Sequence, residues 1–253
     1  MKKYFTEIII GGLFVAILSG LLIWFFQILK EYENRLTKLE TKFDLCVDCS
    51  SRTNRIDNYE YITYKGIDVS ETGEVLVEVD IDLLSEQFRW KCGSIDKIVR
   101  GNEAADLEDV IRKYRDDAEL KNAKGIVCVG TASAEGNTDG EETRAKDRIE
   151  TLINLVNSNL QTKKPIPIYG FNLGKYIEQS SVVCSNATLD QRRILLIKII
   201  QRSDNLTDDK LEESLKRVLL AKAADPNISF PIDIRKYSMF TSDQTMLIYG
   251  RRN

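Results

Sequence analysis

The chemistry open to this chain is limited first by the absence of histidine from its 253 residues. Histidine is the commonest general base and the commonest ligand of transition metals, so an enzyme or a transition-metal centre is less expected without it. The sequence holds no Ser-His-Asp set and no dinucleotide fingerprint. The stretch GTASAEGNTDG at 130–140 contains glycines but lacks the lysine of a phosphate-binding loop. We therefore expect no enzymatic activity, no catalytic residue and no cofactor.

The cysteines limit the compartment and the metal chemistry. They are Cys46, Cys49, Cys92, Cys128 and Cys184. An odd number fits reduced thiols in a cytosol, or two disulfides and one unpaired thiol outside it. Cys128 lies in an apolar run and is predicted to be a core residue. Cys46 and Cys49 form a single C-x-x-C, and without a second pair or a histidine the sequence predicts no metal site.

The overall charge excludes one class of partner. The formal net charge is -3, and 43% of the residues are hydrophobic and 30% charged, as in an ordinary globular protein. Proteins that bind a phosphate backbone carry an excess of basic residues. Nucleic acid is therefore not an expected partner.

One uncharged apolar stretch, residues 8–29, is long enough to span a bilayer. A cleaved signal peptide has a shorter apolar region and a small-residue cleavage site. Here Trp24, Phe25 and Phe26 end the stretch, and aromatic residues of this kind form belts at the membrane interface. The sequence predicts a retained signal anchor, so the lipid bilayer is an expected partner. Basic residues on both sides of the span leave its orientation open.

Two patterns along this helix favour a parallel homo-oligomer. Gly12, Ala16 and Gly20 repeat every four residues, and small residues at this spacing let helix backbones approach closely in lipid. Apolar residues three and four apart, among them Leu29 and Leu36, continue beyond the membrane as a coiled-coil seam. Because this seam covers only about two heptads in water, it is marginal alone, and docking on the chain's own domain is the alternative.

The rest of the chain alternates strand and helix patterns. Strands are predicted at 74–81, 125–130, 166–170 and 192–200, and helices at 106–117 and 145–160. This β-α-β-α-β-β order predicts an α+β fold, a small mixed sheet with its helices on one face. An added helix at 207–223, with Thr207 as its N-cap and Pro226 at its end, is followed by a predicted hairpin at 228–250. The predicted division is a membrane and coiled-coil helix at 1–45, a linker at 46–66, and a domain at 67–253 whose extension begins near residue 203. A first strand is the alternative for residues 50–66.

Three stretches of this domain carry family motifs. Residues 126–136, IVCVGTASAEG, are similar to a strand and loop written I-x-V-x-G-x-T-D-x-x-G. Residues 141–156 lie where that family has N-x-x-L-S-x-x-R-A-x-x-V, with Arg148 on the motif arginine, and QRRILLI at 191–197 is similar to N-R-R-V-x-I. On these motifs, residues 70–202 resemble the OmpA-like, or OmpA/MotB C-terminal, family of peptidoglycan-binding modules.

The resemblance implies a ligand site. In that family an aspartate of the loop holds the ammonium of the stem peptide's diamino acid, and the helix arginine holds its carboxylate. Arg148 retains the arginine, whereas Ser133 stands at the aspartate position. Glu135 or Asp139 can supply a carboxylate from the same loop. The expected ligand-binding residues are therefore Arg148, Ser133, Glu135 and Asp139.

The helix motif departs from the family at further positions. Ala132, Glu141 and Arg144 stand where the family has threonine, asparagine and leucine. The alternative for Arg148 is a solvated helix residue paired with Glu141 or Glu150, an arrangement worth little on a surface.

Three functions compete on this sequence. The first is a membrane-anchored, oligomeric module that binds a peptidoglycan-type ligand or a protein partner, with its domain on the periplasmic side of a bacterial inner membrane. The second is an effector or sensor subunit of a bacterial antiviral defence system whose wall-binding site is lost. The third is a stator-like subunit that works with another membrane protein, against which the absence of a carboxylate inside the span counts.

Overall fold

The structure, a computed structural model, describes residues 27, 30, 51–56, 59–84, 88–115, 122–135, 138–159, 166–178, 186–241 and 247–249. The chain divides into two units, Met1–Val47 and Asp48–Asn253. The predicted span at 8–29 lies outside the described residues except for residue 27, and so do Gly12, Ala16, Gly20, Leu29 and Leu36. Among the described residues, no helix has the length and apolar character needed to cross a bilayer.

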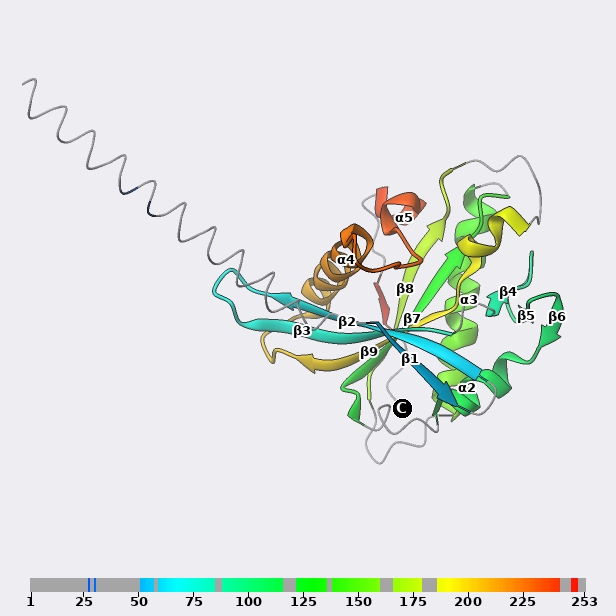
Figure 1. Cartoon of the computed structure of the whole chain (residues 1–253), viewed down its shortest axis with the longest axis horizontal. Helices are drawn as coiled ribbons and strands as arrows, with labels where there is room; N and C mark the ends of the chain where they lie inside the picture. Colours follow the sequence, from blue (N-terminus) through cyan, green and yellow to red (C-terminus); the bar gives the residue numbers. More distant parts are fainter. Residues whose placement is uncertain are drawn as a thin grey trace, which may run out of the picture. The chain divides into compact units, whose positions relative to one another are not determined.

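A mixed sheet forms the centre of the second unit (Figure 1). In the described part of the chain it has seven strands in the order β1-β2-β3-β9-β7-β8-β10. Adjacent strands are antiparallel except β7 and β8, which are parallel. The strand bounds are β1 Ser51–Ile56, β2 Tyr59–Val69, β3 Val75–Leu83, β7 Gly125–Ala132, β8 Ile168–Lys175, β9 Leu195–Arg202 and β10 Leu247–Tyr249.

A second, smaller sheet was not predicted. It consists of β4 Phe88–Trp90, β5 Ile98–Arg100 and β6 Glu103–Ala105, paired antiparallel in chain order. Phe88, Trp90 and Ile98 are buried in the same apolar cluster as α2 and α3. The small sheet therefore packs against the helical layer, and Figure 1 shows it beside α3.

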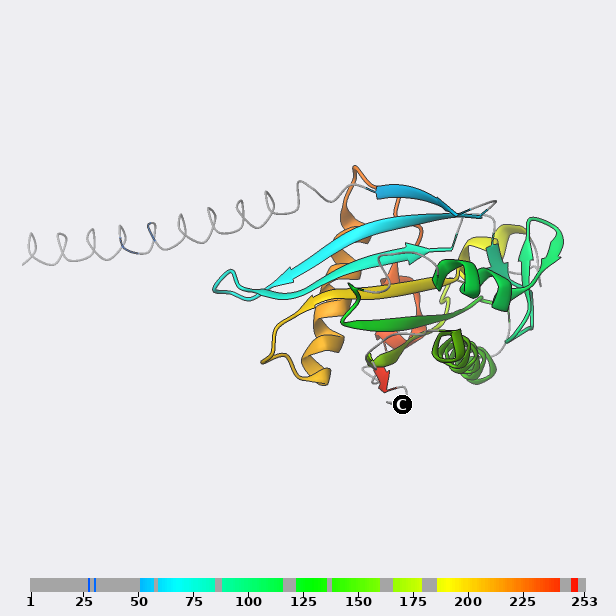
Figure 2. The ribbon, with the colours of Figure 1, turned by 90° about the horizontal axis from the view of Figure 1, so that it is seen from below.

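Helices cover both faces of the main sheet. The helices are α2 Leu107–Arg115, α3 Thr138–Asn159, α4 Asp208–Ala224 and α5 Ser238–Thr241, with 3-10 turns η2 Asn186–Arg192 and η3 Ile234–Lys236. The buried residues of α2 and α3 join one apolar cluster, and those of α4 join the other. In Figure 2, β2, β3 and β9 pass across α4, while α3 is seen nearly end-on on the other side.

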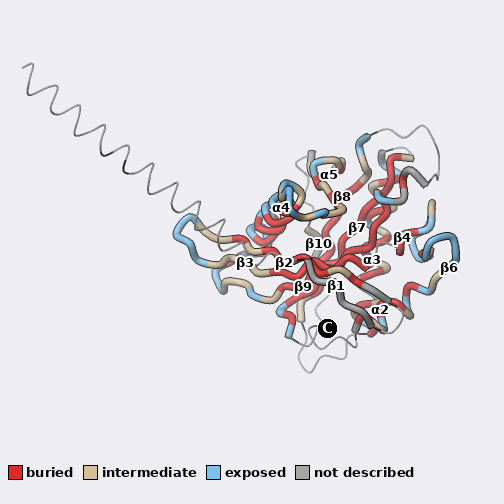
Figure 3. The backbone as a smooth tube through the Cα atoms, viewed as in Figure 1, coloured by how far each residue is buried: buried red, intermediate tan, exposed pale blue. Residues whose placement is uncertain are grey.

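Strand alternation explains the two clusters. In β7, Ile126 and Cys128 face α3, whereas Val127 and Val129 face the α4 side. All eight residues of β7 are buried, as the apolar run in the sequence predicts for a central strand, and Figure 3 shows this burial along β7, β8 and β9. A Cβ at Gly130 would lie 2.3 Å from the carbonyl oxygen of Ala145. Glycine at this position thus lets α3 pack directly onto β7.

The predicted order β-α-β-α-β-β is confirmed as β3-α2-β7-α3-β8-β9. Thr207 caps α4, with its side chain accepting from the amide of Lys210, and Asp225 ends the helix just before Pro226. These elements followed from apolar periodicity and capping chemistry.

Two details differ from expectation. The range 46–66, predicted as a linker with a first strand as the alternative, contains two strands, β1 and most of β2. The predicted helices α2 and α3 share one face of the sheet, and the added helix α4, for which no face was predicted, packs against β2 and β3 on the opposite side. The described residues of the range 228–250 form η3, α5 and β10 rather than a hairpin, and β10 extends the sheet by pairing with β8.

Candidate functional site

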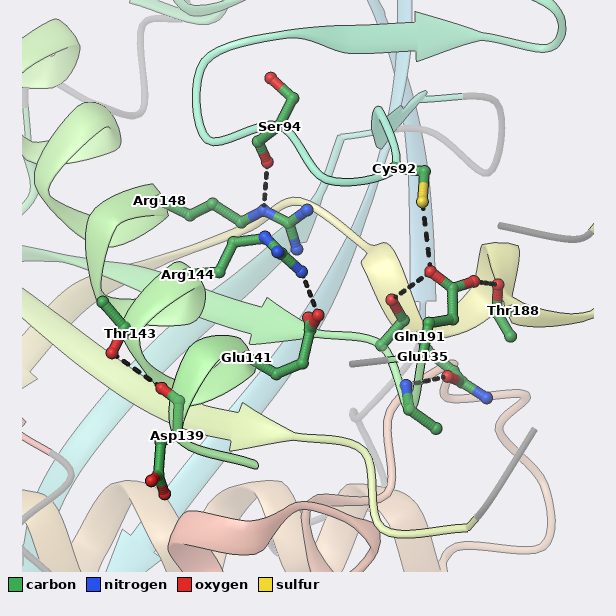
Figure 4. Close-up of polar contacts among 12 residues, drawn as sticks. Cys92, Ser94, Glu135, Asp139, Glu141, Thr143, Arg144, Arg148, Thr188 and Gln191 are labelled. Atoms are coloured by element: carbon green, nitrogen blue, oxygen red, sulfur yellow. Dashed lines mark hydrogen bonds and ion pairs between the residues drawn. The ribbon is translucent and has the colours of Figure 1, made fainter. Parts of the chain in front are cut away.

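Charged and polar side chains gather where β7 runs into α3 (Figure 4). α3 contributes cations and a carboxylate, the loop after β7 contributes a serine and a second carboxylate, and η2 contributes the remaining groups. The β4–β5 turn (residues 91–97) lies against them through main-chain contacts. We call this set the β7-end cluster; its members are Ser133, Glu135, Glu141, Arg144, Arg148, Thr188, Gln191 and Arg192.

Arg148 is almost completely buried, with 1% of its surface exposed. Its Nη1 donates to the carbonyl oxygen of Thr131 at 2.6 Å, and its Nε donates to that of Ser94 at 2.9 Å. Nη2 makes a longer bond of 3.5 Å to the carbonyl oxygen of Lys91. The guanidinium also lies 5.2 Å from the ring centroid of Trp90. Such burial rules out the solvated surface arginine that the sequence left open.

The Arg148 charge is thus buried among neutral acceptors. Within the described part of the chain, each of its hydrogen bonds ends on a main-chain carbonyl rather than a carboxylate. The pKa of Arg148 is lowered to about 9, chiefly by burial and in part by the nearby Arg144 and Arg192 charges. Glu141 and Glu135 act in the opposite direction. A buried cation without a bonded anion is an unusual arrangement, because desolvation strongly disfavours an uncompensated charge.

Glu135 joins the loop after β7 to η2. Its carboxylate accepts a hydrogen bond from Ser133 Oγ at 3.0 Å and another from Thr188 Oγ1. Nearby, the amide of Ala134 donates to Gln191 Oε1 at 3.0 Å. Cys92 Sγ lies 3.3 Å from Glu135 Oε2. The loop is therefore held in one shape by contacts on both sides of its carboxylate.

Glu141 and Arg144 form an ion pair within the first turns of α3. Glu141 is 3% exposed, and Arg144 is partly exposed. The second carboxylate oxygen of Glu141 is buried and has no hydrogen-bond partner among the described residues. This half-satisfied carboxylate adds a second unbalanced group to the β7-end cluster.

The predicted site residues fall in two places. Ser133, Glu135 and Arg148 belong to the β7-end cluster, and Glu135 acts electrostatically on Arg148. Asp139 is exposed in the first turn of α3, and in Figure 4 its carboxylate points away from the cluster. The loop and helix therefore bring three of the four residues together and leave Asp139 outside.

Sequence reasoning missed the partners supplied by the small sheet and by η2. Trp90 and Ser94 come from β4 and its turn, where three-residue strands leave no detectable periodicity. Thr188 lies in the 3-10 turn before β9. Gln191 had a signal, because it stands at the asparagine position of the N-R-R motif.

A second buried charged set, which we call the sheet cluster, lies under α2. Lys198 Nζ is 3.1 Å from Asp82 Oδ2 and 3.6 Å from Asp80 Oδ2. Thr63 Oγ1 donates to Asp82 Oδ1 at 2.6 Å, and the Tyr114 hydroxyl of α2 donates to Asp82 Oδ2. Both Lys198 and Asp82 are fully buried. Sequence reasoning missed this set as well.

Burial dominates the titration of the sheet cluster. It raises the pKa of Asp82 to about 6, although Lys198 and the hydrogen bonds from Thr63 and Tyr114 lower that pKa. Burial and the Asp82 charge raise the pKa of Tyr114 well above its usual range. The Tyr114 bond to Asp82 ties α2 to β3, so this cluster links the helix to the sheet.

The comparisons with known proteins identify no family. No family model matches the chain, and no curated protein matches its sequence. Among solved structures, the OmpA-like domain of FopA1 from Francisella tularensis subsp. tularensis SCHU S4 aligns at 9% identity with a TM-score of 0.31. That alignment covers 61% of this chain and 99% of the FopA1 chain. A TM-score this low carries no argument, so the class of the protein, α+β with a mixed sheet, rests on its own element order.

Proposed function

We propose that this chain is a membrane-anchored, non-catalytic binding module that recognises a carboxylate-bearing ligand of the cell envelope through Arg148. The observation that carries the proposal is the buried guanidinium, whose hydrogen bonds end on neutral carbonyl oxygens. A guanidinium matches a planar carboxylate through two parallel hydrogen bonds. The charge missing from the β7-end cluster is therefore the charge that such a ligand carries.

The balance of charges supports an anionic ligand group. Three arginines of the β7-end cluster, Arg144, Arg148 and Arg192, stand against two glutamates, Glu135 and Glu141. One positive charge is left in excess at a site where burial weakens the competition from water. Glu135, partly exposed, can receive an ammonium of the same ligand. A diamino acid with a free carboxylate, as in a peptidoglycan stem peptide, has both groups.

The cysteines support a periplasmic location for the domain. Cys92 is disulfide-bonded, and Cys128 is free and buried. A bonded Cys92 with Cys128 as the unpaired thiol fits the expectation of two disulfides and one leftover cysteine in an oxidising compartment. Alkylation of intact spheroplasts with a maleimide-polyethylene glycol tests this. We expect Cys92 to react only after reduction, and labelling without reductant would contradict the location.

The anchor and the assembly belong to the same proposal. The apolar stretch 8–29 has the length of a single membrane span. Association through Gly12, Ala16 and Gly20, with Leu29 and Leu36 in the seam, would present several binding domains together. Several weak sites on one polymeric ligand raise the overall avidity without any new contact.

Peptidoglycan binding by full-length protein in detergent tests the function. We expect the wild type to sediment with purified peptidoglycan, and Arg148→Lys to weaken binding at least about tenfold, because lysine keeps the charge but loses the two-point fork. Lys146→Ala is the matched control, since Lys146 is an exposed cation on the same helix. Equal sedimentation of wild type and Arg148→Lys would reject Arg148 as the ligand-binding group.

One observation favours the second function, an effector or sensor whose wall site is lost. The guanidinium of Arg148 is engaged by Thr131, Ser94 and Lys91 carbonyls, as a purely structural arginine would be. In that case peptidoglycan would not sediment any variant. Expression of the wild type in cells carrying a membrane-potential dye would then depolarise them, and an unchanged potential would count against this function.

A further inference from the structure

The β4–β5 turn occupies the edge of Arg148 that a ligand carboxylate would need. Nε and Nη2 lie on the same edge of a guanidinium, and a carboxylate bound in the bidentate manner places one oxygen on each. Here the carbonyl oxygens of Ser94 and Lys91 take those two places, at 2.9 Å and 3.5 Å. Both acceptors belong to the same turn. The turn therefore imitates the two oxygens of a carboxylate with two neutral ones.

We propose that the β4–β5 turn is an autoinhibitory element that closes the ligand site at Arg148 and must swing away before a carboxylate binds. This proposal rests on the proposed function, because it assumes that Arg148 is the binding group. The same turn covers the other charged half of the site, since Cys92 Sγ lies 3.3 Å from Glu135 Oε2. Movement of the turn at Ser94 would thus expose the cation, while the disulfide-bonded Cys92 remains beside the carboxylate.

The turn can move without its strands, although the disulfide-bonded Cys92 holds it at one point. Lys91, Gly93, Asp96 and Lys97 are exposed, whereas Phe88, Trp90 and Ile98 of the flanking strands are buried. The turn keeps its shape through its own bonds, from the amide of Lys91 to Lys97 and from the amide of Ser94 to Lys91. Opening therefore breaks the Arg148 contacts and leaves the apolar packing of β4 and β5 in place.

The closed contact is also weaker than the contact that would replace it. The Lys91 carbonyl oxygen already accepts from the Ser94 amide, and its bond to Arg148 Nη2 is 3.5 Å long. Hydrogen bonds between a guanidinium and a carboxylate are shorter and about twice as strong as those to neutral acceptors. A ligand carboxylate that reaches Arg148 thus forms stronger hydrogen bonds with the guanidinium than the carbonyl oxygens of the turn do.

Two glycines make a matched test. Gly93 in the β4–β5 turn has φ +71°, and Gly101 in the β5–β6 turn has φ +59°. A Cβ placed on either glycine would have no atom within 4 Å, so a Gly→Val change at either position acts through backbone strain alone. Gly93→Val should open the turn at Arg148, whereas Gly101→Val places similar strain in a turn without contact to Arg148.

The first readout needs no ligand. Full-length protein in detergent is treated with phenylglyoxal, and the labelled fraction of Arg148 is measured by peptide mass spectrometry. We expect labelling roughly tenfold faster in Gly93→Val than in Gly101→Val or wild type. Equal labelling in the three proteins would overturn the proposal. If Gly93→Val does not fold, Asp96→Ala replaces it, because it removes the 2.8 Å bond from Ser94 Oγ that shapes the turn.

The second readout separates this proposal from the proposed function. The probe is a muramyl tripeptide ending in a diamino acid, and its terminal carboxamide is the control ligand. We expect Gly93→Val to bind the acid about tenfold more tightly than Gly101→Val does, and Arg148→Lys to remove the gain. Faster labelling without tighter binding keeps the autoinhibitory turn and rejects the proposed ligand. Binding that depends on Arg148 but is equal in both glycine variants rejects the turn and keeps the function.

Discussion

The β7-end cluster and the sheet cluster both bury a cation on the side of the sheet covered by α2 and α3, but they neutralise it differently. In the sheet cluster, Lys198 lies 3.1 Å from Asp82, and two hydroxyl groups donate hydrogen bonds to the Asp82 carboxylate. In the β7-end cluster, Arg148 bonds to main-chain carbonyls, and Glu141 of the same helix pairs with Arg144 instead. The sheet cluster thus neutralises its buried cation with its own carboxylates, which we call a closed cluster. The β7-end cluster does not bond Arg148 to a carboxylate, so we call it open.

This contrast separates a structural role from a binding role. A buried ion pair with its hydrogen bonds satisfied adds little net stability, but removal of one partner leaves a charge stranded. A buried cation among neutral acceptors has already lost its hydration without gaining an anion. Binding of a ligand anion next to it is therefore favourable. The comparison therefore predicts that mutations should affect the fold most at Lys198 and binding most at Arg148.

The largest effect on stability is expected from Lys198→Met. This change strands Asp82 and Asp80 in the sheet and should lower the free energy of unfolding by about 3–5 kcal/mol at pH 7. Urea denaturation of the full-length protein in detergent, followed by circular dichroism, measures the loss. Adding Asp82→Asn should recover most of it, because the stranded charge is then removed. A loss below about 1 kcal/mol for Lys198→Met would show that the ion pair of Lys198 does not stabilise the buried carboxylates of the sheet cluster.

The next largest effect is a pH dependence that belongs to the sheet cluster alone. The pKa of Asp82 is raised from 3.8 to about 6 in the folded chain, so its contribution to stability is full below pH 4 and is lost as the pH rises through 6. The shift corresponds to about 3 kcal/mol. The difference in unfolding free energy between wild type and Asp82→Asn, measured from pH 4 to 7.5, should follow this curve. A difference independent of pH would contradict it.

Periodicity in the sequence was sufficient for four strands of the central sheet, β3, β7, β8 and β9, and for the helices α2, α3 and α4. Residues 74–81 alternate and 125–130 are wholly apolar, and both became strands of the sheet. Short elements could not be predicted in this way, because β4, β5 and β6 have three residues each and their pairing depends on the helices they pack against. The sheet face on which α4 packs could not be predicted either. An apolar stripe on a helix indicates that the helix is buried on one side, but it does not indicate which face of the sheet it covers.

The burial of the two cations, Arg148 and Lys198, was not predicted, for a shared reason. Arg148 stands three residues after Ala145 and four before Leu152, which places it on the apolar stripe of α3, and Lys198 interrupts the apolar run of β9. Both positions indicate burial, but charged residues are ordinarily assigned to solvent because they are rarely buried without partners. The motif resemblance identified Arg148 and the loop of Glu135, whereas the turn that covers them came from a part of the chain without a motif.

The smallest effect on stability is expected at Arg148. The order of stability of two variants, Arg148→Met and Arg148→Lys, is the most direct test of the comparison between the clusters. Arg148→Met removes three hydrogen bonds and the contact with Trp90, but it also removes a desolvated charge, so the net loss should be about 1–2 kcal/mol. Arg148→Lys keeps the charge and cannot reach all three carbonyls, so it should be less stable than Arg148→Met. Urea denaturation at pH 7 ranks the two variants. If Arg148→Met lowered the free energy of unfolding as much as Lys198→Met does, the guanidinium would have a structural role like that of the lysine. The distinction between a closed and an open cluster would then fail.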